Sequence, residues 1–262
     1  MAEPNAEPRK SGGILLTRGM SLRIPAGGLR ISMGPDGLNA EMISLHVSLS
    51  MWLPWLEIAM SHLDEAQAQH ENLLRFRDSG GDVGAALVGE SRAAMQAMMA
   101  AAIAMDALYA TAKDRITLPP SLTKKWRESG TARYAQVTEV FRRAFCLKKQ
   151  STAKVRRVMR ELYRFRDLAV HPPGTYSEPV LHPVLGSGTD RLLVTFSFDN
   201  ARQLVRAAVA YVKILPSRPM DRATEPMQQL AKDLLSLGEP LFLRWEERYG
   251  ELLDKSTETE PT

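Results

Sequence analysis

An arginine, a carboxylate and a histidine follow one another closely in the stretch YRFRDLAVHPPG, residues 163–174. Arg166 and His171 are the only pair in the chain in which four residues separate an arginine from a following histidine. A guanidinium can bind phosphate and stabilise charge that accumulates on phosphorus, and an imidazole can act as a general base or acid near neutral pH. Asp167, four residues before His171, can orient the imidazole or set its tautomer on a helix. These residue types suit proton transfer beside a bound phosphate.

The same residues also have a purely structural interpretation. Arg166 can hydrogen-bond a helix end, and His171 can cap a helix C-terminus, where the helix dipole stabilises a cation. The chain holds 24 arginines and 5 histidines, so one such spacing has little weight alone. Three features favour a functional site: Asp167 directly after the arginine, the basic segment before it, and the Pro172–Pro173–Gly174 exit that fixes where His171 points.

Positive charge is concentrated in the segment that leads to this motif. The formal net charge of the chain is only +4, but residues 142–166 hold ten basic residues and one acid, Glu161, a local charge of +9. Such density attracts polyanions, of which nucleic acid is the commonest in cells and anionic lipid the second. The alternative is a solvated helix face. We predict five of these residues as nucleic-acid contacts: Lys154, Arg156, Arg157, Arg160 and Arg164.

Helices must position these side chains, because apolar residues recur with helical spacing through most of the chain. Proline, glycine and capping residues mark where each helix begins and ends. The first expected helix runs from about Pro54 to Asp78, and the second from Val83 or Glu90 to Ile116. A helical stretch from Ser121 to Phe145, with a break near Ser129–Gly130, comes next, and then a helix from a cap at Ser151 or Thr152 to His171. A helix from a cap at Asp199 or Asn200 to Leu215 is followed by one or two C-terminal helices. Alanine and methionine on nearly all sides predict that the second of these lies at the centre of a bundle.

Strands are expected in two regions. Two or three short strands fit the glycine-punctuated segment before residue 35, and the alternation from Ile43 to Met51 favours a strand over a helix that continues to Trp52. Alternation at 191–198 predicts a further strand. The expected fold is therefore mainly α, a helical bundle with a small accessory β-sheet formed by the N-terminal strands and the strand near 191–198. The predicted organisation is a flexible leader (1–13), a strand-rich segment (14–51), a helical domain (52–216), a C-terminal helical extension (217–255) and a disordered tail (256–262).

Several classes of protein are disfavoured. The N-terminal residues lack the apolar core of a signal peptide, and Gln96 and Asp106 interrupt the Ala/Met-rich stretch 93–112, so we expect a cytoplasmic protein without a membrane partner. The single Cys146 excludes an intrachain disulfide. No Walker loop, dinucleotide fingerprint or zinc spacing is present, and we predict neither a cofactor nor a metal site.

The motif and its place in the chain resemble the HEPN superfamily of helical domains. The hallmark of that superfamily is an arginine, a polar residue, a short spacer and a histidine near the end of the last-but-one core helix, which Arg166, Asp167 and His171 match. The order of helices from about Trp52 to Leu215 is also similar, whereas the N-terminal strands and the C-terminal extension are not covered. Many catalytic members are metal-independent ribonucleases that act as dimers with facing motifs, and others are binding modules without cleavage.

The resemblance implies a metal-independent endoribonuclease of a toxin–antitoxin, stress or defence system, with RNA as substrate, a homodimeric state and an antitoxin or other protein partner. RNA supplies its own nucleophile, the 2′-hydroxyl, so the protein need only move protons and stabilise charge. Asp106 and Tyr163 are predicted supporting residues, and Asp106 is expected to hold Arg164 or Arg166 unless it lies at an exposed edge. Two alternatives are a non-catalytic module that binds nucleic acid or protein, and a structural bundle whose basic face meets an acidic partner.

Overall fold

The computed structural model describes residues 16–35, 37–42, 44–218, 220 and 222–253. These residues form eight helices and three two-stranded antiparallel sheets, which confirms the mainly α class with small accessory sheets. The chain divides into two compact units, Met1–Leu49 and Ser50–Thr262. The predicted leader and tail, and Ile43 of the predicted alternation, lie outside the described residues.

The first unit contains the predicted N-terminal strands as two separate ladders. β1 (Met20–Arg23) pairs with β4 (His46–Leu49), and β2 (Leu29–Gly34) pairs with β3 (Gly37–Met42). Both ladders are antiparallel, and the second is a hairpin whose turn lies between Gly34 and Gly37. Most of their described side chains are exposed, including the apolar Ile31, Met33 and Leu38.

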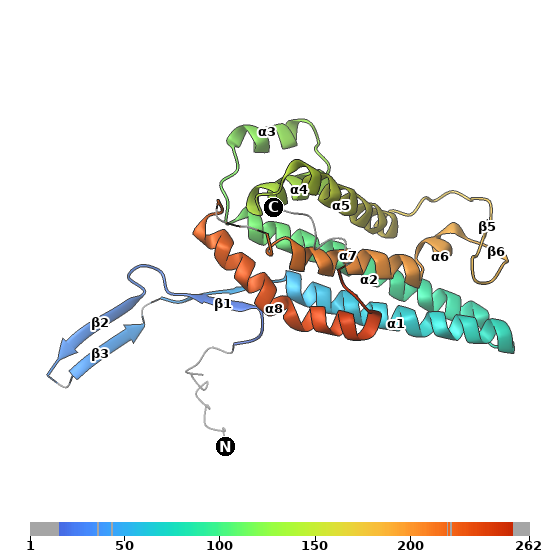
Figure 1. Ribbon diagram of the computed structural model, residues 1–262, viewed down its shortest axis with the longest axis horizontal. Helices are drawn as coiled ribbons and strands as arrows, with labels where there is room; N and C mark the ends of the chain where they lie inside the picture. The colour runs from blue at the N-terminus through green and yellow to red at the C-terminus, as the bar shows by residue number, and fades with distance from the viewer. Residues whose placement is uncertain (1–15, 36, 43, 219, 221, 254–262) are drawn as a thin grey trace, which may run out of the picture. The chain divides into compact units, whose positions relative to one another are not determined.

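Two long antiparallel helices form the frame of the helical unit (Figure 1). α1 (Trp52–Ser79) ends at Gly80, whose left-handed backbone places its N–H on the Phe76 carbonyl. α2 (Val83–Lys113) begins at Asp82, whose carboxylate accepts a hydrogen bond from the Ala85 N–H at 2.8 Å. The tight glycine turn and the cap together fold α2 back along α1.

α2 is the central helix of the unit. Small side chains let α1, α4, α5 and α7 all pack against it, and most of the buried residues on α2 are alanines. By length and hydropathy α2 alone among the described helices passes as a membrane span, but 61% of its apolar window is buried inside the structure. Its apolar composition is thus explained by a central place in a bundle.

Three helices follow on one side of this frame: α3 (Pro120–Glu128), α4 (Arg133–Ala144) and α5 (Lys149–Val170). The predicted break near Ser129–Gly130 separates α3 from α4. α5 begins at Lys149, before the predicted cap. Thr152 Oγ1 donates back to the Lys148 carbonyl at 2.9 Å, and the Ser151 hydroxyl accepts from Arg218, so neither side chain caps the helix. The residues predicted to cap α5 therefore lie within its first turn.

The strand predicted at 191–198 is not formed. α6 (Arg191–Thr195) and α7 (Phe198–Ile214) occupy this segment, while β5 (Val180–Leu181) pairs only with β6 (Gly188–Thr189) among the described strands. Asp190 caps α6 by accepting from the Leu192 N–H at 2.7 Å. Phe196 and Phe198 are buried on either side of Ser197, the residue before α7. The joint between α6 and α7 therefore shows the same alternation of apolar and polar residues that a strand would show.

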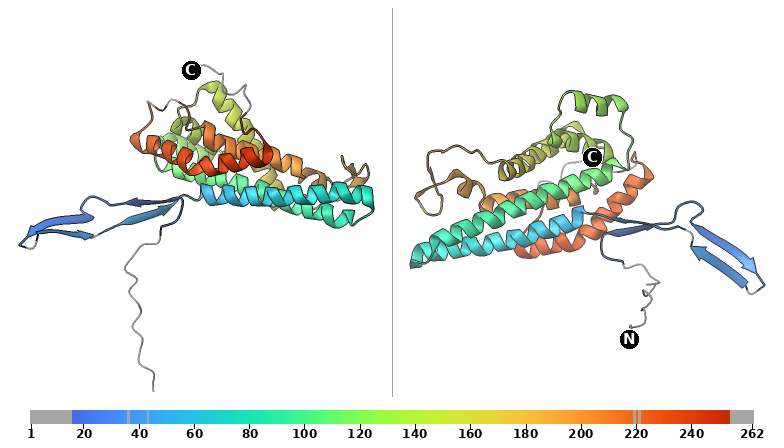
Figure 2. Two further views of the ribbon diagram at one scale, coloured as in Figure 1. Left: turned by 60° about the horizontal axis from the view of Figure 1, so that its bottom comes forward. Right: turned by 180° about the vertical axis from the view of Figure 1, so that it is seen from behind.

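α8 (Glu225–Tyr249) closes the unit by packing against α7 and α1, as the views in Figure 2 show. Trp245 is fully buried in this interface. Asp64 on α1 accepts hydrogen bonds from Arg244 at 2.6 Å and from the Tyr249 hydroxyl. Burial and the neighbouring Asp64 carboxylate both raise the pKa of the Tyr249 hydroxyl.

Candidate active site

The packing of α5 leaves one face of the helix exposed. Its apolar stripe, Val155, Met159, Leu162, Tyr163 and Phe165, is buried against α2, α4 and α7. Near the C-terminal end, the ring of Phe165 meets that of Phe196 edge to face at 6.4 Å. The core therefore fixes the rotation of α5, and its cationic positions face outward.

The structure brings Arg166 and Asp167 together at the end of α5. Arg166 Nη1 lies 3.1 Å from Asp167 Oδ1, and the two side chains are 43% and 61% exposed. His171 is the C-cap residue, is exposed, and donates its backbone N–H to the Asp167 carbonyl at 2.8 Å. No hydrogen bond joins its imidazole to another described residue. Arg166 lies five residues earlier, or about 140° around the helix, so the structure does not bring its guanidinium and the His171 imidazole onto one face.

Four exposed residues instead form a continuous stripe along α5. Arg160, Arg164, Asp167 and His171 follow at intervals of four, three and four residues, the spacing of one helix face. Arg164 contacts Glu161 at 2.8 Å and stacks on the ring of Phe165 at 4.4 Å. The stripe places two guanidiniums, a carboxylate and an imidazole on one side of the helix, where a phosphate chain can reach all of them.

Asp106 does not hold Arg164 or Arg166; of the two expected positions it takes the other, a partly exposed edge. Its Oδ1 accepts from Arg133 Nε at 2.7 Å and from the Tyr163 hydroxyl at 2.8 Å, and the side chain is partly exposed. Arg133 also stacks on Tyr109 at 4.1 Å. Burial, followed by the Asp106 charge, raises the pKa of Tyr163. Asp106 and Tyr163 thus tie α2 to α5 from the inner side of the helix.

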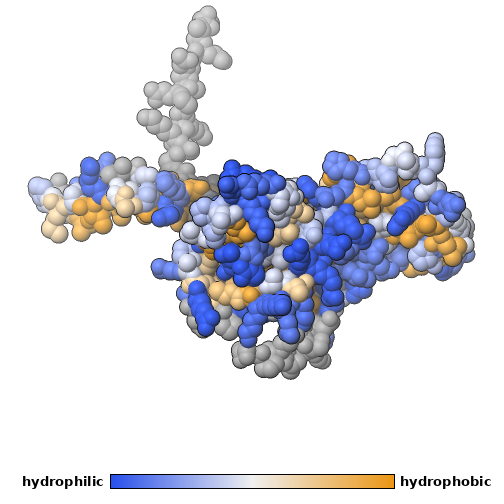
Figure 3. Space-filling view, turned by 90° about the horizontal axis from the view of Figure 1, so that it is seen from above, coloured by the Kyte–Doolittle hydropathy of each residue, from blue (hydrophilic) through white to orange (hydrophobic). Residues whose placement is uncertain are grey.

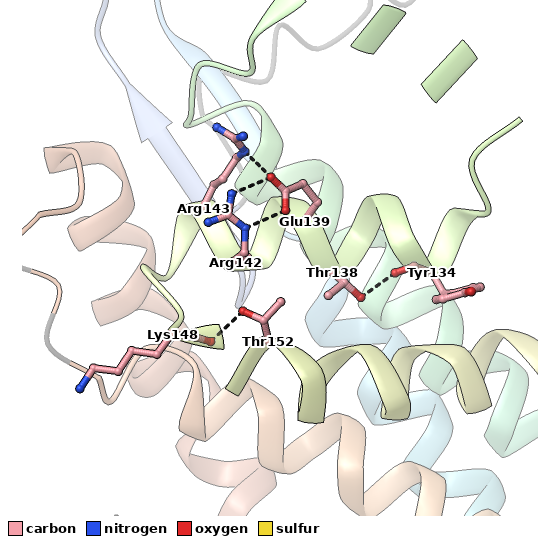
Figure 4. A network of polar contacts seen from close by, with 7 residues as sticks. All are labelled: Tyr134, Thr138, Glu139, Arg142, Arg143, Lys148 and Thr152. Carbon is pink, nitrogen blue, oxygen red and sulfur yellow. Dashed lines mark hydrogen bonds and ion pairs between the residues drawn. The ribbon is translucent and has the colours of Figure 1, made fainter. Parts of the chain in front are cut away.

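Part of the positive charge before the motif is neutralised locally. Figure 4 shows Arg142 and Arg143 turned toward Glu139 on α4, at 2.7 and 2.6 Å. The hydrogen bond from Arg142, together with Arg143, lowers the pKa of the Glu139 carboxyl. These two arginines therefore stabilise α4 and contribute little to an external field.

The five residues predicted to bind nucleic acid are all exposed but do not share one face. Arg160 and Arg164 belong to the motif stripe, and Arg156 lies over the Tyr134 ring at 5.6 Å, toward α4. Lys154 and Arg157 lie on the α7 side, where they line a cavity. Figure 3, which looks down on the α3, α4 and α5 side of the helical unit, shows strongly hydrophilic residues gathered over this face.

A buried group of titratable side chains around Glu90 was not predicted from the sequence. Glu90 on α2 is 2% exposed, and its Oε1 accepts from the Phe198 N–H at 2.8 Å and lies 3.1 Å from His70 Nδ1. Its Oε2 has no hydrogen-bond partner among the described residues. Because Phe198 is the first residue of α7, this carboxylate caps α7 across the core.

His182 belongs to this buried group and not to the motif. It is 3% exposed, and its Nδ1 accepts from the Val184 and Leu185 N–H groups, each at 3.3 Å, which shapes the turn between β5 and β6. Burial lowers the pKa of His182, and the charges of Glu90 and His70 act on it in opposite directions. The signal missed in the sequence was an acid inside the apolar stretch of α2, well before Asp106.

The structure also shows a cavity of about 710 Å³ lined mainly by α5, α7 and residues 252–253. Arg166, Asp167 and His171 do not line it. Within the described ranges no group of three or more His, Cys, Asp or Glu side chains is arranged to hold a metal ion.

Comparisons with known proteins add no relative. No protein-family model, no curated protein and no solved structure matches this chain. Function must therefore be inferred from the chemistry and geometry of the chain itself.

Proposed function

We propose that this protein is a metal-independent endoribonuclease of HEPN-like type that acts in the cytoplasm as a homodimer. The observation that supports it most is the exposed stripe of Arg160, Arg164, Asp167 and His171, with Arg166 held against Asp167. A solvent-accessible imidazole beside several guanidiniums combines a proton carrier with phosphate ligands.

Each side chain has a role in this proposal. Phosphate competes with Asp167 for Arg166, and its binding releases the carboxylate to accept a hydrogen bond from His171. His171 then removes the proton of the 2′-hydroxyl or protonates the leaving oxygen. Arg164, which shares the stripe with His171, stabilises the charge of the pentacovalent intermediate, and Arg166, on another side of the helix, binds a neighbouring phosphate. The chain thus supplies proton transfer and charge stabilisation to a nucleophile that RNA itself provides.

A dimer is part of the proposal because one imidazole cannot readily be acid and base in the same step. Residues 171–179, from His171 into the loop that follows it, are all exposed, so a second copy can approach the end of α5 without unfolding it. Two facing motifs then provide one imidazole for each proton transfer.

Cleavage of mixed RNA in EDTA tests the enzyme proposal. We expect His171→Ala to lower the rate by about 10²–10⁴-fold, the usual contribution of general acid–base catalysis, and to leave the folded fraction unchanged because His171 is exposed. His62→Ala on α1 is the matched control and should cleave at the wild-type rate. Equal rates for wild type and His171→Ala would contradict the proposal.

A non-catalytic nucleic-acid-binding module is the second candidate. It is favoured by the Arg166–Asp167 ion pair and by the absence of a described hydrogen bond to the His171 imidazole. Arg156→Glu with Arg160→Glu should weaken RNA binding and lower the salt slope by about one for each phosphate that the variant no longer binds. The charge-matched pair Arg75→Glu with Lys232→Glu, on α1 and α8, should change binding much less. Binding with these properties and without cleavage under any condition would select the module.

A further inference from the structure

The cavity between α5 and α7 combines a charged mouth with an apolar floor. Its volume of about 710 Å³ lies within the range of small-molecule sites. Residues of α5 form one wall, residues of α7 form the other, and Leu252 and Leu253 lie at its edge. Arg166, Asp167 and His171 lie outside the lining, so this cavity is separate from the proposed cleavage site.

Two arginines from different segments line this cavity together with the phenol of Tyr211. Burial raises the pKa of the Tyr211 hydroxyl, and the charges of Arg157 on α5 and Arg218 after α7 partly oppose this. Arg218 Nη1 also donates to Ser151 Oγ at 2.7 Å, which holds its guanidinium in place. Two guanidiniums, one of them fixed, line the same cavity as two hydroxyls and form an environment that matches a carboxylate or phosphate head group.

Most of the remaining lining is aliphatic, and Lys154, Arg206 and Gln203 complete it. Val155, Leu215 and Leu252 are almost completely buried, and Ala207, Val158 and Ile214 add partly exposed apolar surface. Among the described residues that line the cavity, Tyr211 is the only aromatic one, and Ser151 and Gln203 are the only ones with a neutral amide or aliphatic hydroxyl. Few groups are thus present to stack on a base or bind its edges, whereas a hydrocarbon chain needs only apolar contact.

We propose that this cavity binds a single-chain anionic amphiphile, a fatty acid or an alkyl phosphate. The head group lies between Arg157 and Arg218, within reach of the Tyr211 and Ser151 hydroxyls, and the chain lies along the floor between α5 and α7. This proposal goes beyond RNA cleavage and does not depend on it.

Calorimetric titration of the full chain, with each ligand below its micelle concentration, tests the proposal. Octanoate, nonanoate and decanoate should bind with affinity that rises by up to roughly fourfold for each methylene. Decanoate and decyl phosphate distinguish the two sources of the head group, and binding of either supports the site. Decanol should bind at least tenfold more weakly than decanoate. Equal affinity for decanol, affinity that does not change with chain length, or preferential binding of AMP would overturn the proposal.

Variants locate the site. Arg157→Gln with Arg218→Gln should weaken decanoate binding more than tenfold, whereas Arg160→Gln, on the same helix but outside the lining, should have no effect. Ala207→Phe should block the chain while leaving the cations in place. His171→Ala should bind decanoate as the wild type does, so loss of cleavage and loss of ligand binding are separable. Undiminished decanoate binding by both the double variant and Ala207→Phe would place the ligand elsewhere and contradict the assignment.

Discussion

The helical unit holds a carboxylate and imidazole in two contrasting settings. At the end of α5, Asp167 and His171 are exposed, one helical turn apart, and linked in the described structure only through the backbone. In the core, Glu90 contacts His70, caps α7 and lies near the buried His182. At the end of α5 the carboxylate and the imidazole are accessible to a ligand. In the core the same two groups hold helices of the fold together.

The difference between the two regions shows how burial assigns a role. A buried carboxylate must find donors within the protein, and Glu90 finds them on α1 and α7. An exposed ion pair such as Arg166–Asp167 stabilises the fold little, so its members can exchange partners at low cost. We therefore expect substitutions in the core group to change stability and substitutions at the end of α5 to change function.

The largest expected effect on stability is that of Glu90→Ala. It removes the acceptor of the Phe198 N–H and the partner of His70 from the core, and we expect a loss of about 3 kcal/mol. Asp167→Ala, which removes an exposed carboxylate, should cost less than about 0.5 kcal/mol. Urea unfolding of both variants measures this difference in stability, and equal midpoints would contradict the expected difference between buried and exposed groups.

A smaller loss is expected for Asp106→Ala, because Asp106 is partly exposed. The substitution removes two hydrogen bonds and leaves the hydroxyl of the buried Tyr163 without its acceptor, at a cost of about 1–2 kcal/mol. Adding Tyr163→Phe removes that hydroxyl and should recover part of the loss. A double variant less stable than Asp106→Ala alone would show that the Tyr163 hydroxyl has another acceptor.

The pH dependence of stability sharpens the contrast through His182. Its folded pKa lies below the unfolded value of about 6.5, so the unfolded chain takes up the proton first as the pH falls. The contribution of His182 to the free energy of unfolding is complete above about pH 6.5 and is lost as the pH falls from there toward the lower folded pKa. We expect His182→Gln to reduce the slope of unfolding free energy against pH in this window. A slope as steep as that of the wild type would rule out His182 as its source.

The smallest expected effect is the coupling between Arg166 and Asp167. A double-mutant cycle with Arg166→Ala and Asp167→Ala should give a coupling energy below about 0.5 kcal/mol that decreases further in 1 M salt. Coupling well above this value would mean that the pair is a structural element and not an exchangeable one.

Much of the fold could be predicted from periodicity and helix-end signals. Pro54 in the first turn of α1, the Gly80 stop and the end of α5 before Pro172 are local properties of the chain, and each was confirmed. The joint at 191–198 was mistaken for a strand because Phe196 and Phe198 are both buried, one at the end of α6 and the other at the start of α7. Periodicity cannot separate a strand from two helix ends that bury neighbouring residues.

The site was only partly predictable, because side-chain partners depend on long-range packing. The outward placement of Arg160, Arg164, Asp167 and His171 follows from the apolar stripe of α5. Asp106 contacts Arg133, and Glu90 contacts His70 and the Phe198 N–H. These contacts join residues that are distant in the chain, and a single sequence does not reveal such pairs. The α5–α7 cavity is likewise a property of packed helices and leaves no motif.

One paired measurement tests the central claim most directly. His171→Gln and His182→Gln should be assayed side by side for RNA cleavage in EDTA and for the midpoint of urea unfolding. We predict that His171→Gln keeps its midpoint and loses cleavage, whereas His182→Gln has a lower midpoint and keeps cleavage per folded molecule. Cleavage retained by His171→Gln, or lost by folded His182→Gln, would contradict the assignment of function to the exposed end of α5.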